Sequence, residues 1–314
     1  MIELIVRRLV SLVPVLIAAS FLSFSIMYLC PGDPARIILE MELQAPPTQR
    51  QLVKFKAQHG LDQPFVLQYA NWLGRALHGD LGTSLKTGKK VTPVLIEKLG
   101  HTAAVFFPGM ILSLAIALPL GIMAAVKADS VLDHGLRFTT LGCISIPGFW
   151  WGILLIYCTA IRLRWLPAFG YGRPECYILP IVTLGITGSG ELMRLTRASV
   201  LEVLQLNFVR TARSKGLGQT TILIRHVLRN AFVPIVTSIG LYCSHLVGGS
   251  IIIETLFAWP GIGRHLATAA AMRDVPVIQG IVFISGLFFV LLNLAIDLAY
   301  TFLDPRIKMA ENKG

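Results

Sequence analysis

The stretch at 82–90, GTSLKTGKK, combines glycine, hydroxyl and lysine residues in the manner of a phosphate-binding loop. Such a loop needs four residues between its glycines and a serine or threonine directly after the lysine, because its backbone N–H groups hold the phosphates and the hydroxyl reaches Mg²⁺. Here five residues separate Gly82 from Gly88, and Lys89 is followed by Lys90. The spacing therefore predicts that the chain has no ATP-binding site of its own.

Other residues that carry chemistry are scattered. The five cysteines stand singly without a CxxC pair, and the seven histidines are dispersed. Metal sites, disulfide frameworks and nucleophilic sites need convergent ligands or adjacent acid–base pairs. We therefore predict no metal site and no catalytic residue, and we do not expect the chain to be an enzyme.

A basic stretch at 207–234, NFVRTARSKGLGQTTILIRHVLRNAFVP, separates two apolar runs. Asn207 can cap a short helix, and Gly216 can end it because glycine adopts a left-handed conformation cheaply. Ala212 and Gly216 stand one helical turn apart, so their small side chains predict a shallow spot that another surface can approach closely. Positive charge surrounds this spot, from Arg210, Arg213 and Lys215.

A second helix is expected after this break, capped by Thr220 or Thr221 and running toward Pro234. The cations of the stretch have a simpler explanation, since cytoplasmic loops of membrane proteins are rich in lysine and arginine. Physical reasoning from the residues leaves both explanations open, a docking surface and a mark of topology.

Composition places the chain in a membrane. Hydrophobic residues make up 54% of the 314 residues, charged residues only 14%, and the mean hydropathy is +0.68. These values are too apolar for an ordinary soluble domain. The net charge of +11 does not indicate nucleic acid, because the basic residues lie in short segments beside apolar runs. Membrane topology and anionic lipid headgroups explain this charge better.

The apolar runs predict an all-α, polytopic bundle of about six transmembrane helices. The first run follows Arg7 and Arg8, and we interpret it as an uncleaved anchor rather than a signal peptide because it continues well past Ala18, Ala19 and Ser20. The run at 177–190 ends at Glu191 and is shorter than the ~17 residues that usually span a bilayer. The six runs are 9–29, 102–126, 138–161, 177–190, 231–253 and 276–296.

Three regions follow from this pattern: residues 1–30 with the first span, a polar insertion at 31–100, and a helical core at 101–314. Prolines interrupt the start of the insertion, and 52–60 and 65–79 look like amphipathic helices closed by Gly60 and Gly79. Most lysine and arginine residues of the short loops lie on one side of the six spans, which predicts that both termini and 207–234 are cytoplasmic.

A stripe of small residues marks the fifth span, where Gly240, Ser244 and Gly248 recur every four residues beside His245. Such a stripe usually allows close helix packing, which general experience favours over pore lining. A polar group at membrane depth faces protein or water, so His245 is either a hydrogen-bonded packing residue or part of a pathway. We retain all four residues as candidates for the translocation pathway.

Several motifs stand in order along nearly the whole chain: RRLVSLVPVLIAASFLSFSIMYL, PGDPA, GLDQPFVLQYANWL, GDLGTSL, ISIPGFWWGILL, FVRTARSKGL, RHVLRNAFVPIVT, IIIETLFAWPGIGR, RDVPVIQG and LDPRIK. In this order they resemble the inner-membrane permease subunits of ABC importers, specifically the dipeptide, oligopeptide and nickel branch. The resemblance implies the fold of a type I importer permease. It also implies that 101–314 is the permease core and that 31–100 is periplasmic.

The resemblance implies that 207–230 is a cytoplasmic coupling segment resting in a cleft of an ATPase. Two departures stand out: Arg210 occupies the usual acidic first position, and the Leu-Pro pair is absent, with Pro234 further on. The implied ATPase-coupling residues are Asn207, Arg210, Ala212, Arg213, Lys215, Gly216 and Leu217.

The implied partners are a second related permease, two cytoplasmic ATPase subunits that bind ATP and Mg²⁺, and a periplasmic or lipid-anchored substrate-binding protein. This chain would then form half of the pathway in a bacterial inner membrane and bind no cofactor itself. The binding protein is expected to face 31–100 and the loop at Trp259, Pro260 and Gly261.

The expected substrate is nickel or a metal chelate, because ETLFAWPGIGR and AFGYG look closer to permeases of that kind. Di- and oligopeptides are the alternative. A stand-alone secondary transporter is a further alternative, but inverted repeats with acids at the midplane are not apparent. An intramembrane enzyme would need a convergent polar site, which the sequence does not show.

Overall fold

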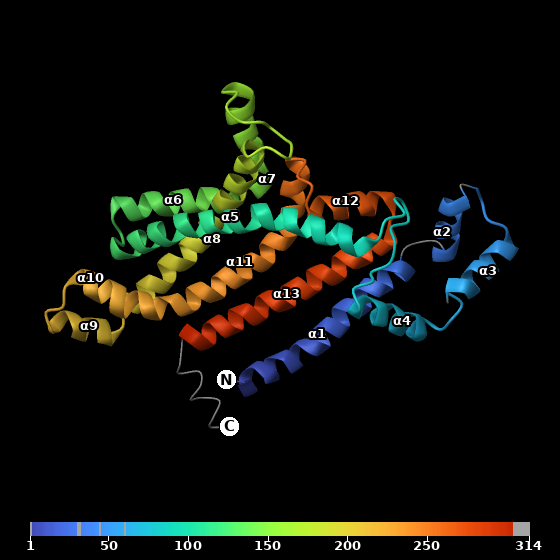
Figure 1. Cartoon of the computed structure of the whole chain (residues 1–314). Helices are drawn as coiled ribbons and strands as arrows, with labels where there is room; N and C mark the ends of the chain where they lie inside the picture. Colours follow the sequence, from blue (N-terminus) through green and yellow to red (C-terminus); the bar gives the residue numbers. More distant parts are fainter. Residues whose placement is uncertain (1, 30–32, 44, 60, 304–314) are drawn as a thin grey trace. The chain divides into compact units, whose positions relative to one another are not determined.

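The computed structural model describes residues 2–29, 33–43, 45–59 and 61–303. These residues form helices and turns, together with one isolated pairing of Thr83 with Lys90. The chain divides into two compact units, one built from 1–101 and 264–291 and the other from 102–263 and 292–314 (Figure 1). The all-α class predicted from the sequence is confirmed.

The first unit contains the amino-terminal helices and most of the last helix. Its aromatic residues join α4 to α1: the Phe24 ring lies 5.4 Å from that of Phe65 and 5.6 Å from that of Trp72. The Ser23 hydroxyl donates to the Gln279 carbonyl of α13 at 2.6 Å. The elements are α1 (Ile2–Leu29), α2 (Pro34–Leu43), α3 (Gln49–His59), α4 (Phe65–Leu77), the start of α5 (Val91–Val126), most of α12 (Ile262–Met272), and α13 (Val275–Leu303) as far as residue 291.

Helix α2 lies in the predicted insertion, where the sequence analysis did not predict a helix. The prolines there were expected to break the chain, but Pro34 occupies the first position of α2, where a missing N–H is tolerated. The Asp33 carboxylate accepts the Ala35 N–H at 3.1 Å and caps this helix. The two helices predicted at 52–60 and 65–79 are present as α3 and α4, and Gly60 lies outside the described residues.

The second unit is organised around α8, which packs against α6, α7 and α11. Its core contains large buried side chains such as Leu184, Tyr242 and Trp259. Besides the rest of α5, the unit contains α6 (Val131–Ser145), α7 (Gly148–Leu155), the π-helical η1 (Ile156–Arg162), α8 (Glu175–Leu204), α9 (Asn207–Ser214), α10 (Gln219–Thr221), the π-helical η2 (Ile222–Leu228) and α11 (Arg229–Leu256).

Five of the six predicted runs each fall within one helix, and the run at 138–161 crosses from α6 into α7 and η1. Among the described residues, three stretches are long and apolar enough to span a bilayer: Val91–Val126, Glu175–Leu204 and Val275–Leu292. Helices α1 and α11 are 28 residues long, and each contains side chains outside the described part of the chain. The polytopic helical bundle is therefore confirmed.

The predicted third span does not run as one straight helix. Helices α6 and α7 meet at a bend of 98°. Ile146 at the bend is extended, with φ −89° and ψ 123°, because the ring of Pro147 disfavours the helical conformation of the preceding residue. The run predicted at 138–161 is thus a broken span or a re-entrant element.

The predicted fourth span is longer than its apolar run. Helix α8 has 30 residues and continues through Glu191, Arg194 and Arg197. In its most apolar window 61% of the residues are buried inside the protein. Charged side chains did not end this helix because Glu191 and Arg194 are exposed and Arg197 is held in an ion pair, so none of the three is buried without a partner.

We expect Gly188→Ala to destabilise the second unit. A methyl group at this position in α8 would overlap the buried phenol of Tyr242 in α11. Overpacking of a core typically costs about 1–3 kcal/mol. Thermal unfolding in one detergent should show a lower midpoint, and Tyr242→Leu in the same background should restore part of it.

Gly135→Ala is the matched control for this substitution, because no atom lies within 4 Å of a Cβ built at Gly135 in α6. It should leave the midpoint unchanged or raise it slightly. Equal midpoints for Gly188→Ala and Gly135→Ala would show that α8 and α11 are not packed as described.

Candidate functional site

The 207–228 segment folds as a helix, a glycine turn and a second helical stretch. Helix α9 ends at Ser214, and Gly216 follows with φ +76°, a left-handed conformation that favours glycine. The Gly216 N–H donates to the Arg213 carbonyl at 2.9 Å, and the Leu217 N–H donates to that of Ala212 at 3.3 Å. The predicted termination of the first helix at Gly216 is confirmed.

The predicted helix caps are wrong. Leu206 occupies the cap position of α9 without a side-chain hydrogen bond, and Asn207 is the first helical residue. Gly218 occupies the cap position of α10, so Thr220 and Thr221 lie inside that helix. The extended backbone of Leu206 and Gly218 starts both helices.

Apolar side chains fasten α9 to the ends of the longer helices. Val209 has no exposed surface and Ala212 is 6% exposed. These two pack in a buried cluster with residues of α5, α8, η2 and α11: Ala125, Val200, Val203, Ile222, Val227, Ala231 and Ile235. Figure 1 shows α9 and α10 side by side at the ends of α8 and α11.

This packing changes the predicted contact surface. Ala212 faces the chain's own core, whereas Gly216 lies in the exposed turn, so the two do not form one open spot. The exposed surface of the segment instead combines cations with three apolar side chains, Phe208 at 40%, Leu217 at 41% and Ile224 at 59% exposure. Its exposed polar members include Asn207, Arg210, Arg213 and Lys215.

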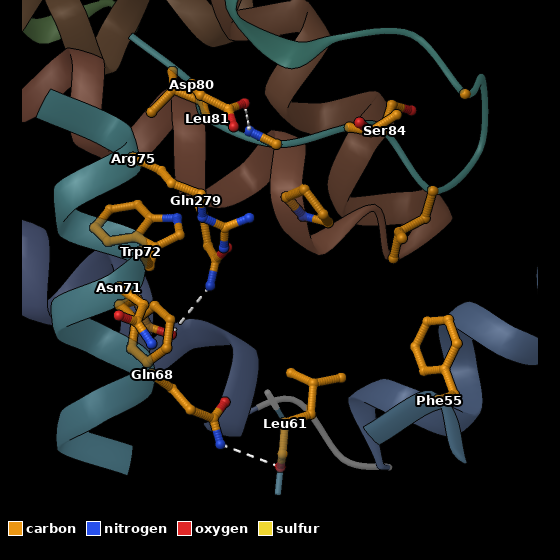
Figure 2. Close-up of a pocket in the computed structure, with 16 residues that line it drawn as sticks. Phe55, Leu61, Gln68, Asn71, Trp72, Arg75, Asp80, Leu81, Ser84 and Gln279 are labelled. Carbon is orange, nitrogen blue, oxygen red and sulfur yellow. Dashed lines mark hydrogen bonds between the residues drawn. The ribbon is translucent and has the colours of Figure 1, made fainter. Parts of the chain in front are cut away.

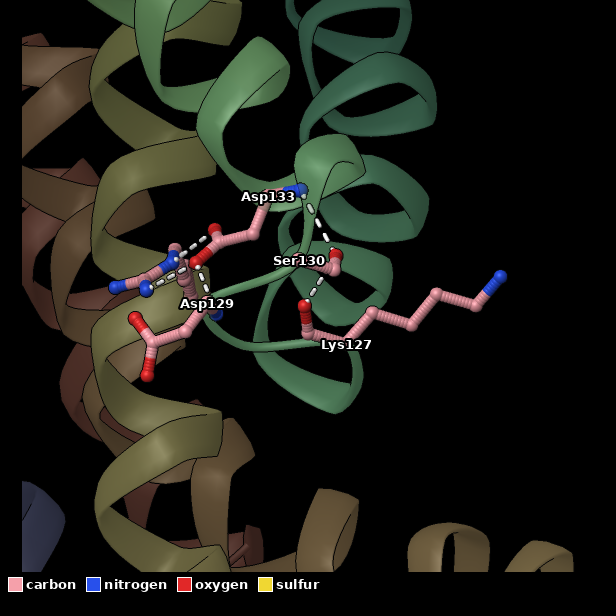
Figure 3. A network of polar contacts seen from close by, with 5 residues as sticks. Lys127, Asp129, Ser130 and Asp133 are labelled. Carbon is pink, nitrogen blue, oxygen red and sulfur yellow. Dashed lines mark hydrogen bonds and ion pairs between the residues drawn. The ribbon is translucent and has the colours of Figure 1, made fainter.

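A buried ion pair links α8 to the start of α6. Arg197 Nε and Nη2 each donate to one oxygen of Asp133 at 2.7 Å, and the Asp133 side chain has no exposed surface. Ser130 caps α6 by accepting the Asp133 N–H at 3.3 Å, and the Asp129 N–H donates to Asp133 Oδ2 at 3.0 Å (Figure 3). Two segments far apart in the sequence are thus held by one carboxylate.

The network keeps Asp133 ionised. This residue lies in the first turn of α6, before the apolar run at 138–161 begins. Hydrogen bonds from Arg197 hold the pKa of the Asp133 carboxyl at about 2, below its usual value of 3.8, although burial acts in the opposite direction. Charge-assisted bidentate pairs of this kind fix orientation as well as distance.

Local sequence patterns contain only half of the signal for this pair. Ser130 followed by Asp133 has the spacing of a capping box, which places an acid in the first turn of a helix. In the sequence, Arg197 is only one of the many cations that lie beside the apolar runs. Its partner lies 64 residues away, a separation that no local pattern encodes.

Comparison with known proteins decides the family. Residues 117–309 match the family described as the inner membrane component of binding-protein-dependent transport systems, and residues 1–106 match the corresponding N-terminal family. The chain belongs to this family. The resemblance to inner-membrane permeases of ABC importers is therefore confirmed, and the chain is a permease.

Curated relatives match the permease along almost its entire length. The oligopeptide transport system permease protein AppB of Bacillus subtilis is 35% identical over 97% of the chain and 98% of its own length. The dipeptide transport system permease protein DppB of Alkalihalophilus pseudofirmus is 37% identical over 96% and 98%. The glutathione transport system permease protein GsiC of Escherichia coli K12 is 37% identical over 98% and 99%.

Among solved structures, the permease resembles the inward-facing MetNI methionine ABC transporter. That match has a TM-score of 0.57 at 18% identity and covers 67% of this chain and 96% of the other. At this identity the likeness concerns the fold alone. It supports the fold of a type I importer permease.

The predicted binding-protein-facing loop needs correction. The Trp259 side chain is fully buried, with its ring 4.6 Å from that of Tyr177 and 5.3 Å from that of Tyr171. It therefore cannot itself contact a binding protein. Gly261 is also buried, because its backbone lies directly against the Glu254 carboxylate, and Pro260 is partly exposed.

Glu254 is the buried centre of this loop. The Thr102 hydroxyl donates to Glu254 Oε1 at 2.7 Å and accepts the Ile262 N–H at 2.8 Å. A side chain at Gly261 or Gly263 would meet the same carboxylate. The small residues of the motif at 254–264 thus let the chain fold closely around one acidic group.

The predicted pathway residues are only partly described. Gly240 is buried in α11. Ser244, His245 and Gly248 continue this helix, but their surroundings lie outside the described part of the structure. Their assignment to a translocation pathway stays a prediction.

The glycine-rich loop at 82–90 holds a carboxylate of the permease itself. Ser84 Oγ donates to Asp274 Oδ2 at 2.5 Å, and the Leu85 N–H donates to Asp274 Oδ1 at 3.1 Å. The N–H groups of Lys86 and Thr87 donate to Ser84 Oγ at 3.3 and 3.1 Å. The loop is therefore a structural clamp that joins the motifs GDLGTSL and RDVPVIQG.

We expect Arg197→Gln to destabilise the permease because it leaves the Asp133 carboxylate buried without its partner. Breaking a buried pair costs about 3–5 kcal/mol, and the lower end applies here because the Arg197 side chain keeps 22% of its surface exposed. Thermal unfolding should show this loss. Arg194→Gln, an exposed position one turn earlier, should change stability by less than about 0.5 kcal/mol.

The pH dependence gives a second readout of the same pair. Because the pKa of Asp133 falls from 3.8 to about 2 on folding, the pair stabilises the fold fully above pH ~4 and loses this contribution as the pH falls toward 2. In Arg197→Gln the carboxyl loses the partner that lowers its pKa while burial still raises it, so the stability difference from wild type should be largest near pH 7 and shrink on acidification. A difference that grows on acidification would contradict the assignment.

Proposed function

We propose that the permease forms half of the membrane path of an importer for short peptides and receives its substrate from a binding protein. The observation that carries this proposal is the agreement of relatives named for oligopeptide, dipeptide and glutathione transport, each aligned over 96% or more of the chain. None of these three relatives is named for nickel. The expected preference for nickel or a metal chelate therefore gives way to the peptide alternative.

The proposed assembly has a second, related permease, two cytoplasmic ATPase subunits and an extracytoplasmic binding protein. ATP and Mg²⁺ would bind the ATPase subunits, and this chain would bind neither. The distribution of lysine and arginine supports cytoplasmic termini, a cytoplasmic 207–228 segment and an extracytoplasmic insertion at 31–100.

The 207–228 segment is the proposed ATPase contact. Its exposed cations and the half-exposed Phe208 and Leu217 offer charge and apolar area to a partner. Val209 and Ala212 would carry the resulting movement into α8 and α11, because these side chains pack against both helices. A docking surface drives transport only when its contacts differ between the inward-open and outward-open states.

The importer proposal is tested by purifying the chain with its partners in a mild detergent. We expect a second permease and ATPase subunits to co-purify. In nanodiscs, their ATPase activity should rise several-fold with a binding protein loaded with a di- or tripeptide. Stimulation by a nickel-loaded binding protein and not by any peptide-loaded one would overturn the peptide assignment, and a lone chain that still moves solute would overturn the importer role.

The docking surface is tested by reversing two of its charges. Arg210→Glu together with Arg213→Glu should release the ATPase subunits and abolish uptake, because both side chains are exposed and make no ion pair among the described residues. The matched control is Arg173→Glu, an exposed cation of the loop before α8 that we place on the opposite side of the membrane. Equal membrane abundance must be shown for both variants. Wild-type ATPase retention in the double variant would contradict docking at this surface.

A further inference from the structure

The first unit contains a cavity that is lined by residues of its amino-terminal helices and of α13. It measures about 540 Å³, within the range of small-molecule sites. Helix α4, the 80–88 loop, α3 and the first turn of α13 border it (Figure 2). The role proposed for the permease as half of a membrane path makes no use of this cavity.

Aromatic side chains supply the apolar wall. Phe24 of α1 and Trp72 of α4 are 3% and 6% exposed, and Phe55 of α3 lies across the cavity from α4 (Figure 2). Because neighbouring side chains cover most of each ring, the wall is rigid and leaves only a small part of each ring open to the cavity. The wall therefore suits an apolar or aromatic ligand side chain.

Two opposite charges line the same cavity. Among the described residues, Arg75 is engaged in no ion pair or side-chain hydrogen bond, and the residue is exposed. Asp80 Oδ1 accepts the Gly82 N–H at 3.0 Å, which leaves the second carboxylate oxygen available. The two charged groups do not pair with one another, so each can receive a charged group of a ligand.

Hydrogen bonds fix the backbone that carries both charged residues. The Asp80 N–H donates to the Arg75 carbonyl at 2.9 Å, while Gly79 turns the chain with φ +81°. The Thr92 hydroxyl donates to the Gly79 carbonyl at 2.6 Å, and the clamp of Ser84 on Asp274 holds the rest of the loop. A site that is rigid before binding loses less entropy when it binds.

We infer that this cavity binds a short peptide with free termini, its carboxylate at Arg75, its ammonium group at Asp80 and an apolar side chain against Trp72. An extended dipeptide spans about 7 Å, which fits easily within the cavity. The zwitterionic chemistry follows from the two charges, whereas the choice of a peptide among zwitterions rests on the proposed function. The site gives the permease its own contact with substrate, in addition to that of the binding protein.

The test uses the complete importer in nanodiscs without its binding protein. The probe is the dipeptide Phe-Ala, compared with N-acetyl-Phe-Ala and with Phe-Ala amide in equilibrium dialysis. Each blocked peptide should bind about tenfold or more weakly, because each loses one charge-assisted contact. Equal affinities of the three peptides for the wild-type importer would overturn the inference, and so would no detectable binding of Phe-Ala.

Two variants test which residue binds which terminus of the peptide. Arg75→Gln should weaken Phe-Ala about tenfold and leave Phe-Ala amide unchanged, whereas Asp80→Asn should weaken Phe-Ala and leave the acetylated peptide unchanged. Lys89→Gln is the matched control, since it removes an exposed charge of the same loop outside this cavity. Losses that are equal for free and blocked peptides in Arg75→Gln would overturn the site.

Different experimental results would contradict the inference and the proposed function. Stimulation of ATPase activity by a peptide-loaded binding protein, without binding of Phe-Ala to the importer alone, would remove the cavity site and keep the importer. Binding of Phe-Ala that depends on Arg75, without stimulation by any peptide-loaded binding protein, would keep the site and remove the proposed substrate.

Discussion

The bidentate pair of Arg197 with Asp133 is the constraint on which the second unit depends. A carboxylate without exposed surface remains charged only when hydrogen bonds replace its water shell, and Arg197 and the Asp129 N–H supply them. The pair fixes the start of α6 against α8, the helix that leads into the 207–228 segment. A displacement of α8 therefore has to carry α6 with it or break the pair.

Close packing supplies the second constraint. Glycines of α5 and α8 face neighbouring side chains directly, as at Gly109 against Leu184 and at Gly185 against Leu112. Absence of a side chain lets helices approach until backbone and side chain touch, which replaces the hydrophobic driving force that lipid does not provide. Helix α8 is thus held at two points along its length, by this contact at Gly185 and by its ion pair at Arg197.

Sequence patterns identified the features that depend only on residues close together in the chain. Apolar runs located the long helices, and Gly216 ended α9 because a left-handed residue is a property of one position. Such patterns missed what depends on distant partners: the inward direction of Ala212, the burial of Trp259, and the pairing of Arg197 with Asp133. Length was also misleading at 177–190, because the charges that follow this run are exposed or paired and do not end the helix. Pathway residues near His245 stay a prediction.

Burial separates two tasks within the 207–228 segment. Val209 and Ala212 face the chain's core and can transmit force only within the permease, whereas Arg210, Arg213 and Leu217 are exposed and can meet only a partner. The division of surface on this short helix therefore supports the proposed role as a rigid link rather than a flexible tether. The cations can differ between relatives without altering the buried face, since partner choice and force transmission rest on different side chains. In the proposed assembly, the departure at Arg210 thus concerns which ATPase docks, and the buried residues set the fold that would receive its movement.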